Sequence, residues 1–192
     1  KRFCAEITRL LSDLHDAVDV LQRGGILAHS TEGVWGLACD PLNYAAVQRI
    51  LEIKTRSEDK GLLLLGGSSE AFAAQLKTLS AADRQRIEDS WPGHVTWILP
   101  DTEYPSWVSG GRATVACRVP DHDQARSIAE KMGRPIVSTS LNQTGEPPLK
   151  VYADAVAQFA HRVDLVLPGE IGSAQGPSKI LQLEGAGTQT LR

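Results

Sequence analysis

Short apolar runs alternate with amphipathic stretches along the whole chain. Leucine and valine recur at helical spacing through residues 6–23, and the pair Gly24-Gly25 ends that pattern. A second helix is predicted behind an Asn43 cap. Further helices are predicted at 69–76, 80–89, 121–132 (with an acidic cap) and 152–160. Strands are predicted at 26–28, 62–65, 95–99, 114–119, 136–137 and 163–167, with weaker candidates at 180–183 and 188–191.

Strands interleaved with helices predict α/β architecture, with a sheet covered by helices on at least one face. The segment 97–114 contains proline and glycine but no helical pattern, so part of the sheet is expected to be antiparallel or mixed. The chain has no internal repeat and no linker long enough to separate domains. We therefore expect residues 1–192 to form a single domain.

The composition narrows the possible functional classes. Of the 192 residues, 42% are hydrophobic and only 5% are aromatic, which predicts a substantial and mostly aliphatic core. The net charge of −3 lacks the basic surplus of a protein that coats nucleic acid, although it leaves local basic patches open.

The cysteines and histidines are scattered. Three cysteines without a C-x-x-C pair argue against a disulfide framework and for a reducing cytosol, and no Cys/His cluster predicts a zinc site. No apolar stretch approaches the ~20 residues of a membrane-spanning helix. Residues 1–6 turn polar at once and lack the core of a signal peptide, so we expect a cytoplasmic protein without membrane contact.

Two polar segments could hold a ligand near the ends of predicted elements. Residues 30–33 (Ser-Thr-Glu-Gly) follow the first predicted strand, where α/β sheets collect ligands, but a turn that bonds its own backbone explains them more simply. Lys54, Arg56 and Lys60 come just after the Asn43 helix. The helix dipole explains these cations, and recognition of phosphate or carboxylate explains them equally well.

Three further features are weak by themselves. Residues 138–142 (Ser-Thr-Ser-Leu-Asn) could bond phosphate or ribose oxygens, although a polar strand-to-loop transition is slightly simpler. An unpaired Arg118 could face a cleft from its predicted strand, or it could lie on an exposed edge. The glycine-rich segment 169–178 could approach an anion, but it matches neither a Walker nor a Rossmann loop.

The order of these fragments is more specific than any one of them. Thr-Glu at 31–32, K-x-R at 54–56, W-P-G-x-V-T at 91–96, V-A-x-R-V at 115–119, S-T-S-x-N at 138–142 and P-S-x-I at 177–180 follow one another along the chain. From about Gly24 to Ser178 this order resembles the YrdC/TsaC family of threonylcarbamoyl-AMP synthases.

The resemblance implies a twisted mixed α/β sheet flanked by helices, with a large concave groove lined by positive charge. It implies that L-threonine, bicarbonate and ATP, with Mg²⁺, are joined into threonylcarbamoyl-AMP with release of pyrophosphate. A partner complex would then transfer the threonylcarbamoyl group to tRNA, and the chain itself could bind tRNA or RNA weakly. The length is similar to that of the single-domain form.

The same resemblance implies two groups of contacts. The threonine contacts are Thr31, Arg118, Ser138 and Ser178. The nucleotide contacts are Lys54, Arg56, Lys60, Thr114, Ser140, Asn142 and Arg192, with Lys54 and Arg56 as the catalytic pair and no protein ligand to a metal. The assignment of Arg192 depends on chain length and not on a motif.

The chain departs from the family pattern at four positions. Ser30 and His94 stand where the family usually has proline, Trp35 replaces a smaller aromatic residue, and Leu141 replaces alanine. Leu141 would be the most consequential if it faced the pocket, because its bulk would alter substrate fit. We expect these departures to be variation with activity retained.

Two other functions fit parts of the pattern. An RNA- or tRNA-binding module could use the same groove without chemistry, although the acidic net charge and the few aromatic residues count against it. An enzyme that handles a carbamoyl or acyl phosphate could share the fold and use a different acceptor. Amino-acid dependence of pyrophosphate release would separate that enzyme from a threonylcarbamoyl-AMP synthase.

Overall fold

The computed structural model describes residues 2–185 and 187–192, with side chains described from residue 12 onward. Its helices are α1 (Arg2–Gln22), α2 (Tyr44–Lys54), α3 (Ala73–Leu76), α4 (Ala81–Asp89), α5 (Ser106–Ser109), α6 (Asp123–Met132) and α7 (Tyr152–Phe159), with 3-10 turns η1 (Glu58–Lys60) and η2 (Ser69–Phe72). Its strands are β1 (Leu27–Ser30), β2 (Trp35–Cys39), β3 (Leu63–Leu65), β4 (Val95–Pro100), β5 (Thr114–Arg118), β6 (Ile136–Ser140), β7 (Leu165–Val166), β8 (Lys179–Glu184) and β9 (Gly187–Thr190).

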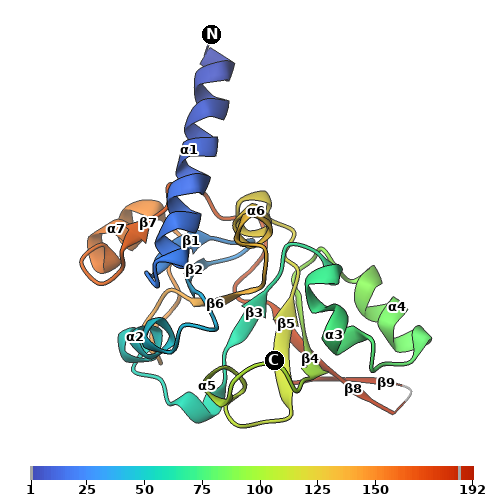
Figure 1. The fold of residues 1–192 in the computed structure, drawn as a ribbon. Helices are drawn as coiled ribbons and strands as arrows, with labels where there is room; N and C mark the ends of the chain where they lie inside the picture. Colours follow the sequence, from blue (N-terminus) through green and yellow to red (C-terminus); the bar gives the residue numbers. More distant parts are fainter. Residues whose placement is uncertain (1, 186) are drawn as a thin grey trace.

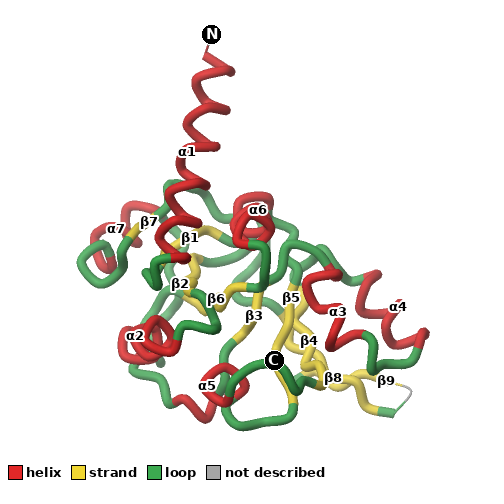
Figure 2. The backbone as a smooth tube through the Cα atoms, in the orientation of Figure 1, coloured by secondary structure: helices red, strands yellow, loops and turns green. Residues whose placement is uncertain are grey.

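The strands of the described residues form one nine-stranded sheet in the order β7-β1-β2-β6-β3-β5-β4-β8-β9. The pairs β1/β7, β3/β5 and β4/β8 are parallel, and the remaining neighbours are antiparallel. Figure 2 shows the strands crossing the middle of the molecule with helices outside them. The predicted mixed α/β sheet flanked by helices is confirmed.

The two faces of this sheet have different covers. On one face α2, α3, α4, α5 and α7 pack against the strands and form the larger hydrophobic core. On the other face α1 and α6 lie side by side and form a second core over parts of β1, β2, β3 and β6 (Figure 1). The remainder of this second face lines a cavity. The sheet is therefore packed throughout on one side and only partly packed on the other.

Local sequence accounts for the helix that leads into the site. The Asn43 side chain accepts a hydrogen bond of 3.0 Å from the Ala46 amide, so Asn43 caps α2 as predicted. At the other end Thr55 adopts a left-handed conformation (φ 49°, ψ 50°), a geometry that commonly terminates helices. This cap makes the chain leave the helix sharply between Lys54 and Arg56.

Several sequence expectations need correction. The cap of α6 is His122, whose Nδ1 accepts from the Ala125 amide, and not the acidic residue expected there. The segment 97–114 contains the one-turn helix α5, which was not expected. The antiparallel pairing expected there is confirmed, because β4 and β5 are antiparallel. Strand β2 was missed, because Gly36 and Ala38 interrupt its apolar pattern. No described helix is long and apolar enough to cross a membrane.

Candidate functional site

The cavity has a volume of about 670 Å³ and lies on the partly covered face of the sheet. Because side chains alternate along a strand, the same face that carries the second core also turns alternate residues of six strands into the cavity. These residues are Gly36 of β2, Leu63 of β3, Ile98 of β4, Thr114, Ala116 and Arg118 of β5, Ser138 and Ser140 of β6, and Ile180 and Gln182 of β8. Small side chains at Gly36, Ala116 and Ser138 leave room that larger residues would fill.

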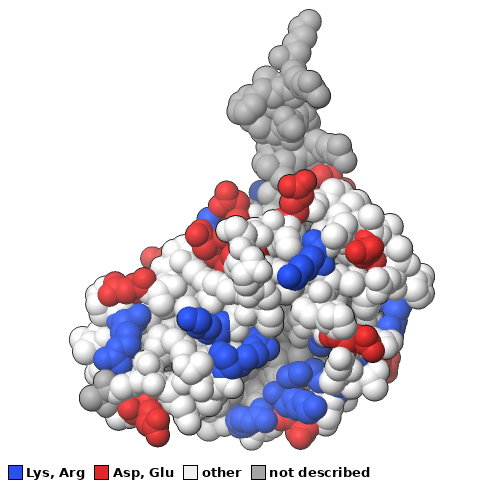
Figure 3. Space-filling model, turned by 180° about the vertical axis from the view of Figure 1, so that it is seen from behind, with Lys and Arg blue, Asp and Glu red and all other residues white. Residues whose placement is uncertain are grey.

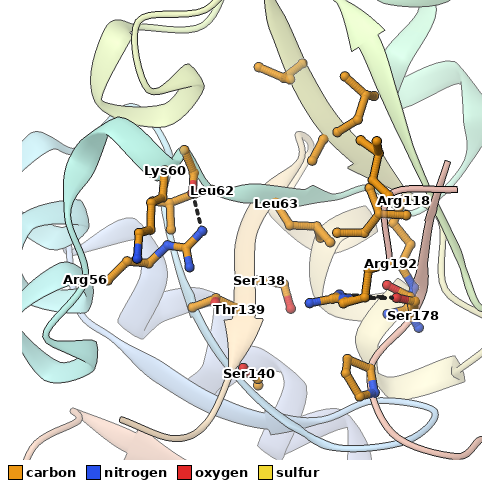
Figure 4. Close-up of a pocket in the computed structure, with 18 of the residues that line it drawn as sticks. Arg56, Lys60, Leu62, Leu63, Arg118, Ser138, Thr139, Ser140, Ser178 and Arg192 are labelled. Carbon is orange, nitrogen blue, oxygen red and sulfur yellow. Dashed lines mark hydrogen bonds between the residues drawn. The ribbon is translucent and has the colours of Figure 1, made fainter. Parts of the chain in front are cut away.

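All the residues predicted to contact substrate line this one cavity. They are Thr31, Lys54, Arg56, Lys60, Thr114, Arg118, Ser138, Ser140, Asn142, Ser178 and Arg192. In Figure 4 Arg56 and Lys60 lie on one side of the cavity, Arg118, Arg192 and Ser178 lie on the opposite side, and Ser138 to Ser140 lie between them. The structure therefore brings the predicted residues together, while their individual roles stay predictions.

Lys54 is the last residue of α2 and is 3% exposed. Its ammonium donates to the Ser140 carbonyl at 2.5 Å, and to the Asn142 carbonyl and Asn142 Oδ1 at 3.0 Å each. Burial, with a smaller effect of Arg56, lowers the pKa of Lys54 to about 8, so most of the ammonium is charged at neutral pH. Lys54 thus ties the end of α2 to the turn that follows β6.

Arg56 lines the same cavity and makes fewer hydrogen bonds than Lys54. Its Nη2 donates to the Gly61 carbonyl at 3.0 Å, whereas its Nε is buried and has no hydrogen-bond partner among the described residues. Burial and then the neighbouring Arg112 lower the pKa of Arg56, which shows that cations crowd here. Arg112 also lines the cavity, and the sequence analysis missed it because no motif marks it.

Arg118 faces the cavity from β5, but it is not unpaired. Its Nη2 donates to the Glu32 carboxylate and, at 3.1 Å, to Nδ1 of His94. Glu32 is itself fixed, because its Oε1 accepts from the Asp121 amide at 2.8 Å. The contacts of Nη2 with Glu32 and His94 therefore hold the guanidinium in place, while its buried Nε has no partner among the described residues.

The hydroxyl groups of the site are also held by neighbours. Thr31 Oγ1 donates to the Val34 carbonyl at 2.7 Å, so the turn expected at 30–33 is present and lies at the cavity wall. Ser140 Oγ donates to Asn142 Oδ1 at 2.6 Å, and Ser178 Oγ lies 2.8 Å from Thr96 Oγ1. These contacts fix the hydroxyl positions before any ligand arrives.

His29 lies beneath Ser138 and was not singled out from the sequence. It is fully buried, and burial lowers its pKa to about 4, so the ring is neutral. Nδ1 lies 3.1 Å from the Ser30 carbonyl and must carry the proton, because a carbonyl can only accept. Nε2 then accepts from Ser138 Oγ at 3.3 Å, which orients the hydroxyl and turns its oxygen lone pairs to other partners.

Arg192 closes one side of the cavity. Its Nε and Nη2 donate to the Ser178 carbonyl at 3.3 and 3.2 Å, and it lies with Ser178 and Arg118 in Figure 4. Burial is the main cause that lowers the pKa of Arg192, and the charges of Arg118 and Arg56 lower it further. The structure therefore places Arg192 beside predicted threonine contacts, although it was assigned to the nucleotide.

The positions that depart from the family pattern differ in their consequences. Leu141 is fully buried in the larger core and is absent from the described cavity lining, so its bulk does not narrow the cavity. Ser30 is likewise outside that lining, and its Oγ donates to Gln124 Oε1 at 2.7 Å. Of these three side chains, only that of His94 has a hydrogen bond to a residue of the described cavity lining, which is Arg118.

The charge around the cavity is strongly asymmetric. Figure 3 shows lysine and arginine side chains gathered around a hollow on one face. Among the described lining residues there is no aspartate or glutamate, and Glu32 reaches the site only through Arg118. The described residues also contain no cluster of three or more potential metal ligands. Such a site suits a polyanion with a neighbouring carboxylate.

Comparison with known proteins identifies the family. A family model described as telomere recombination and named for Sua5, YciO and YrdC matches residues 19–192. A relative from Halorhodospira halophila named threonylcarbamoyl-AMP synthase is 41% identical over 178 residues, covering 92% of this chain and 93% of the relative. A relative of the same name from Nitrosococcus oceani is 40% identical over 165 residues, covering 85% of this chain and 89% of its own.

Solved structures agree with this likeness. The crystal structure of P. abyssi Sua5 complexed with L-threonine has a TM-score of 0.86 and 29% identity, and the match covers 93% of this chain and 53% of that one. This chain thus spans about half the length of P. abyssi Sua5. E. coli YciO, at 24% identity and a TM-score of 0.79, shares the fold. Because the family model and these relatives align along most of its length, the chain belongs to the Sua5/YciO/YrdC family.

Proposed function

We propose that this protein is a threonylcarbamoyl-AMP synthase, a nucleotidyltransferase that joins L-threonine, bicarbonate and ATP and releases pyrophosphate. The relatives that share this name align with nearly the whole chain. The product would pass to a threonylcarbamoyl transferase complex that modifies tRNA. The site geometry supports the proposal independently of the names.

The observation that carries the proposal is a pair of unsatisfied donors. Three buried side-chain donors lack a hydrogen-bond partner among the described residues, namely Trp35 Nε1, Arg56 Nε and Arg118 Nε, and the two arginines of this set line the cavity. A buried unsatisfied donor costs about 1–3 kcal/mol, and more when it is charged, so such groups in a native fold need an explanation. Both guanidinium groups belong to the cavity lining, and the proposed substrates supply a triphosphate and an amino-acid carboxylate that can pair with them.

The wall that contains Arg118 suits the amino acid. Arg118 provides a fixed cation for the carboxylate, and the hydroxyls of Thr31, Ser138 and Ser178 lie in the same cavity. A related protein, P. abyssi Sua5, has been crystallised with L-threonine. We assign threonine to this wall, with Arg192 beside it as a residue that covers both substrates.

The opposite wall suits the nucleotide. Lys54, Arg56 and Lys60 supply cations, and Thr114, Ser140 and Asn142 supply hydroxyl and amide groups. Mg²⁺ ordinarily binds through one or two carboxylates together with substrate phosphates, and the described lining offers no carboxylate. We therefore assign Mg²⁺ to the nucleotide substrate, as Mg·ATP, and not to a protein site.

The chemistry needs positioning and charge neutralisation more than a protein nucleophile. A carbamate oxygen of N-carboxythreonine forms a bond to the α-phosphorus, and the bond from that phosphorus to the pyrophosphate oxygen breaks. Both reactants are anions, so fixed cations between them lower the barrier, and holding them together supplies much of the remainder. We assign these tasks to Arg56, which lines the cavity, and to Lys54, which donates to Ser140 and Asn142.

The test is direct. Purified protein is incubated with ATP, Mg²⁺, bicarbonate and L-threonine, pyrophosphate is measured, and the mixed anhydride is sought by mass spectrometry. We expect both products, with pyrophosphate release dependent on L-threonine. Release that ignores the amino acid would favour an enzyme with another acceptor, and a salt-dependent shift of RNA without ATP turnover would favour an RNA-binding module.

A further inference from the structure

His94 connects the cavity wall to the glycine-rich segment 169–178. One ring nitrogen, Nδ1, lies 3.1 Å from Arg118 Nη2, and the other, Nε2, lies 3.0 Å from the Gly176 carbonyl. A guanidinium only donates and a carbonyl only accepts, so one tautomer satisfies both contacts. The ring is neutral, Nδ1 accepts from Arg118, and Nε2 donates to Gly176.

The segment 169–178 is attached at other points as well. Side chains hold its two ends, because His122 Nε2 lies 3.0 Å from the Glu170 carbonyl and Thr96 Oγ1 lies 2.8 Å from Ser178 Oγ, and backbone bonds hold its middle. The Gly172 amide donates to the Thr31 carbonyl at 3.0 Å, and the Ala174 amide donates to the Glu32 carbonyl at 3.1 Å. Near its end the segment passes so close to Gly33 that a Cβ there would lie 2.2 Å from the Gly176 carbonyl oxygen. His94 adds a side-chain bond at this last point, two residues before Ser178.

We propose that His94 is a positioning residue for the amino-acid substrate: its neutral ring aims Arg118 and holds Gly176, and thereby sets the affinity of the carboxylate subsite. This inference rests on the proposed function. Because the ring contacts Arg118 and Gly176 and not the cavity itself, His94 acts through those residues and not on the reacting atoms.

The electrostatic surroundings make this link sensitive to pH. Burial and then Arg118 lower the pKa of His94, while Glu32 and the carbonyls of Gly176 and Pro177 oppose that shift. Glu32 Oε1 lies 3.9 Å from Nδ1, and Arg192 is a further cation near Arg118. Protonation would place a hydrogen on Nδ1, remove the acceptor that Arg118 uses, and set two cations against each other. Because the pKa of His94 is lowered, affinity for L-threonine should fall in acid, at pH values below the ordinary range of a histidine.

Two amide variants separate the two bonds. In His94→Asn the side-chain oxygen can occupy the place of Nδ1 and accept from Arg118, but the chain is too short to reach Gly176. In His94→Gln the amide nitrogen can reach Gly176, but the acceptor for Arg118 is lost. His94→Leu loses both. The exposed His161 provides a matched control as His161→Leu.

The measurements are KM for L-threonine, KM for ATP and kcat of pyrophosphate release between about pH 5 and 8, together with calorimetric L-threonine binding. We expect His94→Leu to raise the KM for L-threonine about tenfold, from the loss of two hydrogen bonds of modest net worth, with the KM for ATP nearly unchanged. The amide variants should fall between wild type and His94→Leu. The rise of KM with acidity should be present in wild type and in His161→Leu and absent from the His94 variants.

Each outcome of these measurements supports or overturns the positioning role of His94. If wild type is active and folded His94 variants keep both its L-threonine KM and its pH profile, the positioning role is wrong and the proposed function stands. If KM for both substrates and kcat change together without a change in pH dependence, His94 is only structural. If wild type neither binds L-threonine nor releases pyrophosphate, the proposed function fails and this inference fails with it.

Discussion

One face of the sheet has a half that α1 and α6 cover and a half that lines the cavity, and the same strands run through both halves. On β6, Ile136 is fully buried in the second core, and Ser138 and Ser140, two and four residues later on the same face, line the cavity. On β2 the same change runs from Ala38 in the core to Gly36 at the cavity. Regular alternation fixes which side chains share the face, and side-chain size and polarity decide whether helices cover it.

The covered half stabilises the fold, and the open half carries cations that repel one another. Burial and neighbouring positive charge lower the pKa values of Arg56 and Arg192, so these groups gain little from the folded state without an anion. The hydrophobic contacts under α1 and α6 must offset that cost. Substitutions should therefore separate stability from activity along a single strand.

The largest effect is expected in the covered half, with Ile136→Ala. Ile136 is fully buried, so the loss of its side chain should lower the free energy of unfolding by about 2–5 kcal/mol. Urea unfolding measures this change, and the folded fraction should keep its KM for both substrates. Ser140→Ala, at a half-buried position on the same face of β6, is the matched control and should cost about 1 kcal/mol or less. Equal losses in the two variants would contradict the division.

His29, under the boundary between the halves, should make stability depend on acid. Its pKa is near 6.5 when unfolded and about 4 in the fold, so between these values the unfolded chain binds the extra proton. Stability should fall as the pH drops from 7 to 4, by roughly 3 kcal/mol from this group.

The measurement for His29 is urea unfolding of wild type and His29→Gln at several pH values. The difference between the two proteins isolates this residue from the carboxylates, which also titrate in acid. The exposed His161→Gln should retain the wild-type slope. A His29→Gln protein with that same slope would show that His29 is not responsible.

In the open half, Arg56→Ala should lower kcat for pyrophosphate release about 100-fold, the usual effect of removing one donor that stabilises developing charge. Lys54→Ala should act similarly, because it also releases Ser140 and Asn142. Steady-state kinetics measures both, and thermal unfolding checks that each variant is folded. The surface variant Arg84→Ala should be unaffected. Unchanged turnover would remove Lys54 and Arg56 from the catalytic residues.

The smallest of these effects is expected from Ser178→Ala. Loss of its hydroxyl should raise the KM for L-threonine by up to about tenfold while the KM for ATP stays constant. Ser106→Ala, on the exposed start of α5, is the control. A change in ATP saturation instead would reverse the assignment of the two cavity walls.

Much of the site could be predicted because its residues follow recognisable local elements. Asn43 marks the start of α2, and Lys54 and Arg56 lie where the end of that helix meets the cavity. The alternation Val115, Cys117, Val119 against Ala116 and Arg118 placed Arg118 on the correct face of β5.

The remainder depends on pairings between distant segments. The contact between Glu32 and Arg118 joins residues 86 positions apart, and His29 meets Ser138 across 109 positions. Neither pair has a local pattern, and strand β2, which lies between β1 and β6 in the sheet, was not predicted. Arg112 similarly enters the cavity through the fold and not through a motif.

The left-handed backbone at Thr55 carries a conformational cost at the point where the chain turns from Lys54 to Arg56. A residue with a branched Cβ is disfavoured at φ 49° by roughly 1–2 kcal/mol, and glycine would remove that penalty. Thr55→Gly should thus raise the melting temperature. It should also loosen the angle between Lys54 and Arg56, because glycine permits many backbone conformations there. Thr55→Gly would therefore raise thermal stability and slow turnover at the same time.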